Sequence, residues 1–277
     1  MPNKDLIKIR TVHPLLTLIG LWLWACQPPK TNHPGIALSF DDHFIKEWHA
    51  LRPLLKKHQA KVTFFITCPQ PLFTEEIQML RELSSDGHEI GFHGTIHGKS
   101  TELIEHLGPK AYKETELNPG LSYLHQAGFH PTAYAHPGGN HNARVDSVLF
   151  ASGFRILRDV SLAERSWQGF KLYHISPKYL STIYYDFKGK RLVDALLIDT
   201  SVNLSYEELK EALQKARQDG TTILLFGHKP LDSHKKPNEY GFDINQLEEI
   251  LNLANELSLP FYTMSELPKL SDHIVYP

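Results

Sequence analysis

The sequence contains few cysteines and no apolar run long enough to cross a membrane. Only two cysteines occur in 277 residues, which excludes the disulfide-rich scaffolds of small secreted proteins. The longest largely apolar stretch, residues 14–25, falls short of the roughly 20 residues that a membrane-spanning helix needs. Positive and negative charges nearly cancel, with 29 Lys and Arg against 31 Asp and Glu, so the charge gives no reason to expect a nucleic-acid partner.

The composition is that of a globular protein. Hydrophobic residues make up 41% of the chain and charged residues 22%, which excludes a disordered or collagen-like chain. A length of 277 residues suits one α/β barrel at least as well as two smaller domains. We therefore expect a single domain.

The amino-terminal region has the pattern of an export signal. Lys4, Lys8 and Arg10 precede the apolar residues 14–25, and Leu23-Trp24-Ala25-Cys26 resembles the lipobox of bacterial lipoproteins. We expect residues 1–25 to be a signal peptide cleaved before a lipidated Cys26, residues 26–34 to be a tether, and residues 35–277 to be the domain. Trp24 is unusual in a lipobox, and an ordinary signal peptide or an uncleaved anchor is the alternative. The protein is then exported and lipid-anchored at the bacterial cell envelope, on the periplasmic or outer-membrane side.

Short apolar runs alternate with longer amphipathic stretches through most of the remaining sequence, as expected for strands followed by crossover helices. The predicted strands are residues 36–40, 62–67, 89–92, 132–135, 154–158, 221–226 and 260–262, and the predicted helices are residues 45–58, 74–85, 101–126 with breaks, 143–152, 206–218 and 244–256. Residues 160–204 show no clear period, apart from possible strands at 184–185 and 192–198. The alternation predicts the α/β class, as a distorted (β/α)7-type barrel in one domain.

Two histidines lie four residues apart directly after the predicted strand 89–92. With 17 histidines in the chain, about one such pair is expected by chance. The position of His93 and His97 strengthens the signal, because the carboxyl ends of barrel strands carry the functional loops. We therefore consider both to be candidate metal ligands.

Asp41 and Asp42 follow another predicted strand, residues 36–40. Neighbouring strand residues point to opposite faces, so both carboxylates enter one site only if the chain bends sharply there. A divalent cation held by one carboxylate would leave the other free as a base. A solvated pair, or a cap for the following helix, is the alternative interpretation.

Two more predicted strands end in residues suited to catalysis. His228 follows strand 221–226, and a side chain that titrates near neutrality suits proton donation to a leaving group. Gly138 and Gly139 follow strand 132–135, where backbone N–H groups can approach a substrate and stabilise an oxyanion. A structural histidine and a plain turn are the alternatives. Cys68 ends an apolar run, and we expect a buried thiol there rather than a nucleophile.

Together these motifs resemble those of the polysaccharide deacetylase family, also called carbohydrate esterase family 4 or the NodB homology domain. Ser39-Phe40-Asp41-Asp42 is similar to its first motif, in which the first Asp is the catalytic base and the second a metal ligand. The segment from His93 to His97 resembles the second motif, which supplies two imidazole ligands. His228 falls where a late motif places the general acid. The likeness spans residues 35–267.

The third family motif differs in this chain. The family often has Arg at the position of Ala135, whereas Pro137 and Gly139 match. In the family that Arg orients the catalytic Asp, and Arg158, at the end of the next predicted strand, is our candidate substitute.

Two further differences affect the pocket and the metal site. The family's fourth motif, an Asp and a Trp that line the pocket, is only loosely matched by Asp159 and Trp167. Gly94 replaces a hydroxyl residue of the second motif, and the loss of one hydrogen bond around the ligands is expected to loosen metal binding.

The resemblance implies an enzyme, a metal-dependent hydrolase that removes acetyl groups from an acetylated polysaccharide. Asp42, His93 and His97 would hold a divalent ion, expected to be Zn²⁺. Asp41 would take a proton from the attacking water, and His228 would protonate the departing amine or alcohol. The expected oxyanion and substrate-binding residues are Pro137, Gly138, Gly139, Arg158 and Trp167.

The expected substrate is a glycan that contains N-acetylglucosamine, with O-acetyl xylan as the lesser option. We expect membrane contact through the amino-terminal lipid only, no nucleic acid, and a monomer. Three alternatives remain open. The same metal site could cleave another amide or ester, the protein could be an inactive or weakly active carbohydrate-binding lipoprotein, or it could be a purely structural envelope lipoprotein, which requires the candidate side chains to lie far apart.

Overall fold

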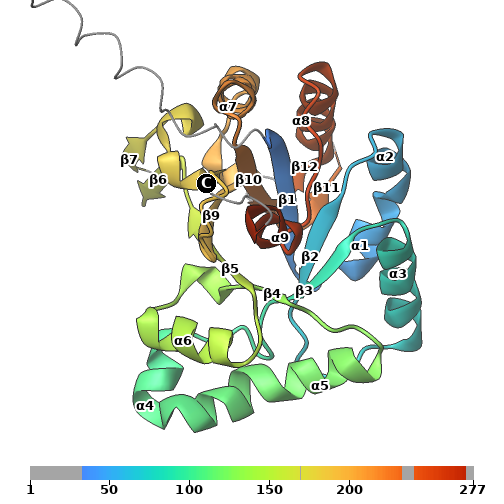
Figure 1. Ribbon diagram of the computed structural model, residues 1–277, viewed down its shortest axis with the longest axis vertical. Coiled ribbons are helices and arrows are strands. Elements are labelled where there is room, and N and C mark those ends of the chain that lie inside the picture. Colours follow the sequence, from blue (N-terminus) through green and yellow to red (C-terminus); the bar gives the residue numbers. More distant parts are fainter. Residues whose placement is uncertain (1–32, 169, 233–239, 273–277) are drawn as a thin grey trace, which may run out of the picture. The chain divides into compact units, whose positions relative to one another are not determined.

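Seven parallel strands form a closed barrel in the computed structural model, which describes residues 33–168, 170–232 and 240–272 (Figure 1). The strand order is β1-β2-β3-β4-β5-β9-β10, and β10 pairs again with β1 to close the barrel. This confirms the predicted single-domain (β/α)7-type barrel. The barrel strands are β1 (Gly35–Asp42), β2 (Val62–Ile66), β3 (Glu89–Phe92), β4 (Ala133–Ala135), β5 (Ile156–Ser161), β9 (Leu192–Leu197) and β10 (Thr222–Gly227).

Helices surround the barrel in the order expected for crossover connections (Figure 1). The predicted helix 45–58 is two helices, because Pro53 lacks the N–H that a continuous helix would use there. The helices are α1 (Ile45–Ala50), α2 (Arg52–Lys57), α3 (Thr74–Ser85), α4 (Ser100–Tyr112), the π-helix η1 (Lys113–Leu117), α5 (Asn118–Gln126), α6 (Ala143–Ala151), α7 (Tyr206–Asp219), α8 (Ile244–Glu256) and α9 (Glu266–Asp272).

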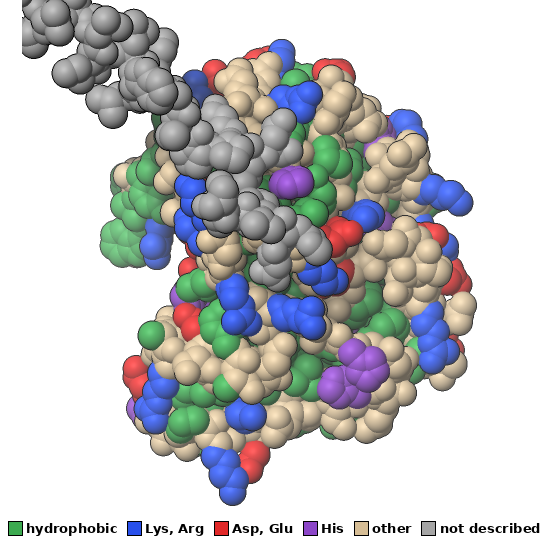
Figure 2. All heavy atoms as spheres, viewed as in Figure 1, with side chains coloured by type: hydrophobic (Ala, Val, Ile, Leu, Met, Phe, Trp, Pro, Cys, Tyr) green, Lys and Arg blue, Asp and Glu red, His purple; other side chains and the backbone are tan. Residues whose placement is uncertain are grey.

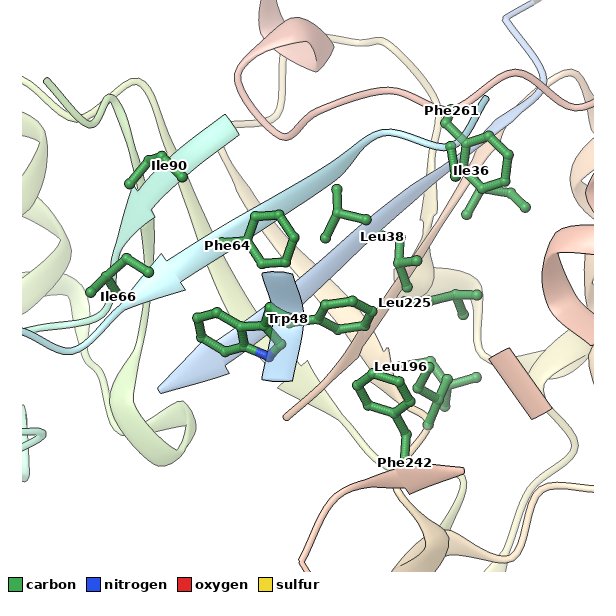
Figure 3. Packing of buried hydrophobic residues seen from close by; sticks show 14 of the residues in the cluster. Ile36, Leu38, Trp48, Phe64, Ile66, Ile90, Leu196, Leu225, Phe242 and Phe261 are labelled. Carbon is green, nitrogen blue, oxygen red and sulfur yellow. The ribbon is translucent and has the colours of Figure 1, made fainter. Parts of the chain in front are cut away.

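The two faces of each barrel strand belong to different parts of the core. Leu38 packs with Trp48 and Phe64 in the larger cluster, which lies between the barrel and its helices (Figure 3). Ala37 belongs to the smaller cluster, built from the alternate residues of the same strands. Since side chains alternate along a strand, Asp41 shares the inward orientation of Ala37. The strand period therefore places Asp41 at one end of the barrel interior.

Residues 160–204 contain a β-hairpin outside the barrel, which explains why their period was unclear. The strands β6 (Glu164–Trp167) and β7 (Phe170–His174) pair only with each other. Short 3-10 helices, η3 (Pro177–Tyr179) and η4 (Ser181–Ile183), lead to β8 (Tyr184–Tyr185), which pairs antiparallel with β10. The barrel strand β9 follows.

The predicted strand 260–262 is wrong. Phe261 forms a single bridge with Ile36, because β2 pairs with β1 only from Leu38 onward and leaves one short free edge. The predicted signal peptide and Cys26 lie outside the described residues. Within the described ranges, none of the helices has the length and apolar character required to traverse a bilayer.

Candidate active site

Asp41 pairs with Arg158 inside the barrel. The Arg158 guanidinium donates to Asp41 Oδ2, and both side chains are almost completely buried. Burial alone would raise the pKa of Asp41, but Arg158 and the imidazoles of His93 and His228 outweigh it and hold that pKa below its usual value. Asp41 Oδ1 accepts no hydrogen bond from the described residues. The carboxylate is therefore ionised and keeps one oxygen free to accept a proton.

Asp42 turns towards two histidines at the end of β1. Its backbone has a φ of +86°, the sharp bend that brings neighbouring carboxylates of one strand into a common site. Asp42 Oδ1 lies 3.6 Å from His93 Nε2 and 3.6 Å from His97 Nε2. One ligand atom from each of the three residues lies within 4.8 Å of the others. One carboxylate and two imidazoles in this spacing fit a single divalent cation.

His93 is arranged to act as a ligand. Its ring is buried, and its Nδ1 lies 2.9 Å from the carbonyl oxygen of Ala135, so Nδ1–H donates and Nε2 keeps its lone pair towards Asp42. Burial, the largest influence, lowers the pKa of His93 to about 4. The imidazole is therefore neutral at pH 7, which is the form that binds metal.

Glu116 supports the turn that carries His97. Its carboxylate accepts hydrogen bonds from the backbone N–H groups of Ile96 and Gly98, and burial raises its pKa to about 7. A Cβ at Gly94 would lie 2.1 Å from Glu116 Oε1, and the φ of Gly94 is +84°. Gly94 thus makes room for a carboxylate that fixes the turn in place of the hydroxyl residue expected from the family motif.

His228 is held by a second buried aspartate. His228 Nδ1 donates to Asp199 Oδ2 at 2.6 Å, and the His228 backbone N–H donates to Asp199 Oδ1 at 3.1 Å. Burial would lower the pKa of His228, but the bond to Asp199 and the charges of Asp41 and Asp42 raise it above its ordinary value. This pairing favours a protonated imidazole near neutrality.

Tyr240 links the Asp42, His93 and His97 group to His228. Its hydroxyl donates to Asp42 Oδ2 at 3.2 Å, and its ring centroid lies 4.4 Å from that of His228. Asp41, Asp42, His93, His97 and His228 therefore converge at the carboxyl ends of β1, β3 and β10. This geometry argues against the structural-lipoprotein alternative, which required these side chains to lie far apart.

The turn after β4 is the 3-10 helix η2 (Pro137–Gly139), whose two glycines have positive φ angles of 57° and 65°. A Cβ at Gly139 would lie 2.8 Å from Asp159 Oδ1, whereas one at Gly138 would meet nothing within 4 Å. Gly138 thus has open space where a side chain would lie, which leaves room for a substrate to approach its backbone.

Trp167 lies on the β6–β7 hairpin, outside the barrel strands. Trp167 ends β6 and its side chain is 63% exposed, and among the described residues no hydrogen bond or ring contact joins it to the Asp41 group. Figure 2 shows apolar side chains gathered on the surface over β6 and β7. The exposed apolar residues of this hairpin are Trp167, Phe170, Leu172 and Tyr173. If Trp167 binds substrate, it does so from the exposed surface of the hairpin.

Sequence reasoning missed Asp199, Tyr240 and Glu116. Asp199 follows the barrel strand β9, and its position after an apolar strand was a usable signal within an otherwise unclear region. Glu116 bonds to backbone groups 18 and 20 positions away, and Tyr240 bonds to Asp42 198 positions away, and sequence spacing reveals neither contact. Cys68 is buried, and burial raises its pKa to about 12, as expected of an inert thiol rather than a nucleophile.

Solved structures with this fold include several carbohydrate esterases. Peptidoglycan deacetylase PdaC from Bacillus subtilis is 18% identical with a TM-score of 0.53, and the match covers 87% of this chain and 93% of that one. A family 4 acetyl xylan esterase from Clostridium thermocellum, in complex with a cobalt ion, is 18% identical with a TM-score of 0.51, over 85% of this chain and 90% of that one. At these identities the likeness shows a common fold.

A third structure with this fold is BA3943 from Bacillus anthracis, described as a pseudoenzyme of the same esterase family. It is 13% identical with a TM-score of 0.53, over 86% of this chain and 66% of that one. No curated protein sequence matches this chain. The family model for polysaccharide deacetylase matches residues 29–157. Residues 29–157 of this chain thus match the polysaccharide deacetylase model, and the chain has the barrel fold seen in solved structures of carbohydrate esterase family 4.

Proposed function

We propose that the protein is a metal-dependent hydrolase that removes acetyl groups from an acetylated polysaccharide, with a glycan containing N-acetylglucosamine as the first candidate. The observation that carries the proposal is the convergence of an ionised carboxylate, a carboxylate-imidazole ligand set and a hydrogen-bonded imidazole at one end of the barrel. The match to the polysaccharide deacetylase model and the fold shared with peptidoglycan and xylan deacetylating enzymes support the substrate class.

Asp42, His93 and His97 would hold the cation, with Zn²⁺ as the expected ion because an N₂O donor set suits it. When bound, such a cation supplies Lewis acidity, which polarises an acyl oxygen and acidifies water. Asp41 Oδ1 accepts the proton of the attacking water, and Arg158 keeps that carboxylate ionised. His228 donates its proton to the departing amine or alcohol, with Asp199 orienting its ring. The Gly138 N–H and Pro137–Gly139 turn contact the acyl group.

Two single substitutions separate the base from the ligands. Asp41→Asn removes the proton acceptor and leaves the three ligands in place, so we expect at least a 100-fold loss of turnover with metal still bound. His97→Ala removes a ligand, so metal and activity are lost together. Acetate release from N-acetylglucosamine oligomers and from acetylated xylan, with metal content by mass spectrometry, measures both. Near-normal turnover by Asp41→Asn would refute the base assignment.

A carbohydrate-binding protein without turnover is the second candidate, because the family position of the orienting Arg is Ala135 and BA3943 shows that the fold occurs in a pseudoenzyme. Arg158 at Asp41 favours the enzyme instead. Retention of glycans without acetate release from any acetylated glycan or small amide would establish the binding protein. Acetate release from small amides alone would favour a different amide substrate.

We also propose that the protein is exported and anchored at the cell envelope through a lipid on Cys26, as a monomer whose membrane contact is this lipid. The support is the sequence pattern of residues 1–26. Metabolic labelling with a radioactive fatty acid tests this, because the wild-type chain incorporates label and Cys26→Ala does not. Label in Cys26→Ala, or none in the wild type, would contradict lipidation at this cysteine.

A further inference from the structure

A second group of ligand-type side chains lies between the end of β4 and the first turn of α6. It consists of His136, His141 and Asp146, and it shares no residue with the Asp42, His93 and His97 group. His136 follows β4, His141 lies in the loop before α6, and Asp146 lies in the first turn of α6. One ligand atom from each lies within 4.8 Å of the others. The fold thus brings two imidazoles and a carboxylate together a second time.

His136 is buried without a hydrogen bond. The side chain is completely buried, and neither ring nitrogen makes a hydrogen bond within the described residues. Nε2 lies 3.2 Å from Asp146 Oδ1 but without the alignment of a hydrogen bond. An unsatisfied buried polar group destabilises the folded state, and a bound cation would remove this penalty.

The Nδ1 atom of His141 faces the Asp146 carboxylate. Its Nδ1 lies 3.1 Å from both carboxylate oxygens of Asp146, and its Nε2 lies 3.0 Å from Asp159 Oδ2. A hydrogen bond from Nε2–H to Asp159 leaves the Nδ1 lone pair facing Asp146 and His136. A carboxylate that accepts from the far nitrogen of a ligating histidine is the usual support of metal sites.

The distances suit one small cation. Zn–N bonds of about 2.0–2.1 Å in a tetrahedron place the ligand atoms roughly 3.3 Å apart, close to the separations of 3.2 Å and 3.1 Å that link His136 and His141 to Asp146. The His141 and Asp146 side chains are partly exposed, at 18% and 13%, so solvent ions can reach the site. We propose that His136, His141 and Asp146 form a second metal site for Zn²⁺ or a similar first-row divalent cation.

An ion at this site joins β4, the loop before α6 and α6 itself, with β5 connected through Asp159. It thereby fixes both ends of the Pro137–Gly139 turn. The relevance of this turn to substrate binding rests on the proposed function of the Asp41 site. The binding of the ion itself does not depend on that function.

Zinc stoichiometry of the full chain tests the second site. After removal of metal with a chelator, titration with Zn²⁺ alone and mass spectrometry should give two ions per wild-type chain, one in His141→Ala and one in His97→Ala. The double variant should hold none. A wild-type chain that binds one ion, lost in His97→Ala, would overturn the second site and leave the first intact.

Two further variants separate ligation from folding defects. Asp146→Asn keeps the size of the side chain but removes its charge, and it should also lose one ion while its far-ultraviolet circular dichroism stays unchanged. Asp159→Asn leaves the ligands in place and should weaken Zn²⁺ binding about 10- to 100-fold at this site only. Two ions bound with unchanged affinity in Asp146→Asn would refute the assignment.

The matched control is another histidine pair. His125 and His130 have ring centroids 4.9 Å apart, and both residues are exposed. His125→Ala should keep both ions, because no third ligand-type side chain lies close to this pair among the described residues. Loss of an ion in His125→Ala would place the second equivalent there and contradict the proposal.

Discussion

Arg158 and Asp41 are 117 residues apart in sequence and pair inside the barrel. The guanidinium also lies over the Phe226 ring, 4.3 Å from its centroid, so aromatic and ionic contacts fix its position. Ala135, the position at which the family motif has Arg, faces the same interior cluster. In this chain the positive charge beside Asp41 therefore comes from β5, whereas the family motif would place it on β4.

Arg158→Met should unfold more easily and shift the activity profile. Removing one partner of a buried ion pair costs about 3–5 kcal/mol, and the pKa of Asp41 rises once burial is no longer offset. The acid side of the pH-rate profile should therefore move to higher pH. Arg158→Lys keeps the charge and should restore most of the profile. If the acid side of the profile does not move in Arg158→Met, Arg158 does not control the ionisation of Asp41.

Asp199→Asn should move the alkaline side of the same profile. Asp199 raises the pKa of His228, and a general acid works only while it is protonated. Without that charge His228 loses its proton at lower pH, so the rate should begin to fall at lower pH than in the wild type. The pH dependence of kcat for acetate release measures this. A profile that does not change would exclude His228 as the general acid.

Gly94→Ala should destabilise the protein more than a glycine replacement elsewhere. The added Cβ would meet Glu116 Oε1 at 2.1 Å, and the residue has a positive φ, so we expect a loss of about 2–3 kcal/mol. Gly128→Ala is the matched control, because Gly128 also has a positive φ but no atom within 4 Å. Its expected loss is about 1 kcal/mol of backbone strain. Urea unfolding compares them, and equal losses would show that Glu116 is not in the way.

The metal-free protein should lose stability in mild acid through His88. This side chain is buried, its Nδ1 accepts from the Val62 N–H at 3.1 Å, and burial lowers its pKa to about 4. The unfolded chain binds the proton near pH 6.5, so the stability present above that pH is lost as the pH falls from 6.5 to 4. The loss amounts to about 3 kcal/mol. His88→Gln should unfold with a weaker pH dependence over this window, and an equal dependence would contradict the role of His88.

The barrel and part of its site could be predicted because strand ends are readable in sequence. The apolar runs before Asp41, His93 and His228 are short and clear, and closure of the barrel brings their ends together. The rest depends on long-range contacts. The place of Asp199 after β9 was a usable signal, but its bond to His228 cannot be inferred from spacing, and Tyr240 reaches Asp42 from 198 residues away.

The strands β6 and β7 could not be predicted from sequence for another reason. Their apolar side chains are exposed, with Phe170 at 72%, whereas sequence patterns assume that apolar residues are buried. The edge of β1 at Ile36 likewise has room for one bridge only. Phe261 therefore forms an isolated bridge, and the sequence pattern does not distinguish such a bridge from a strand.

The described residues begin at the barrel end opposite Asp42. His33 is hydrogen-bonded to Gly220 and Thr222, beside the start of β10, whereas Asp42 lies at the far end of β1. A spectroscopic label attached at His33 would consequently report on the barrel end opposite Asp42, without touching the side chains around Asp41.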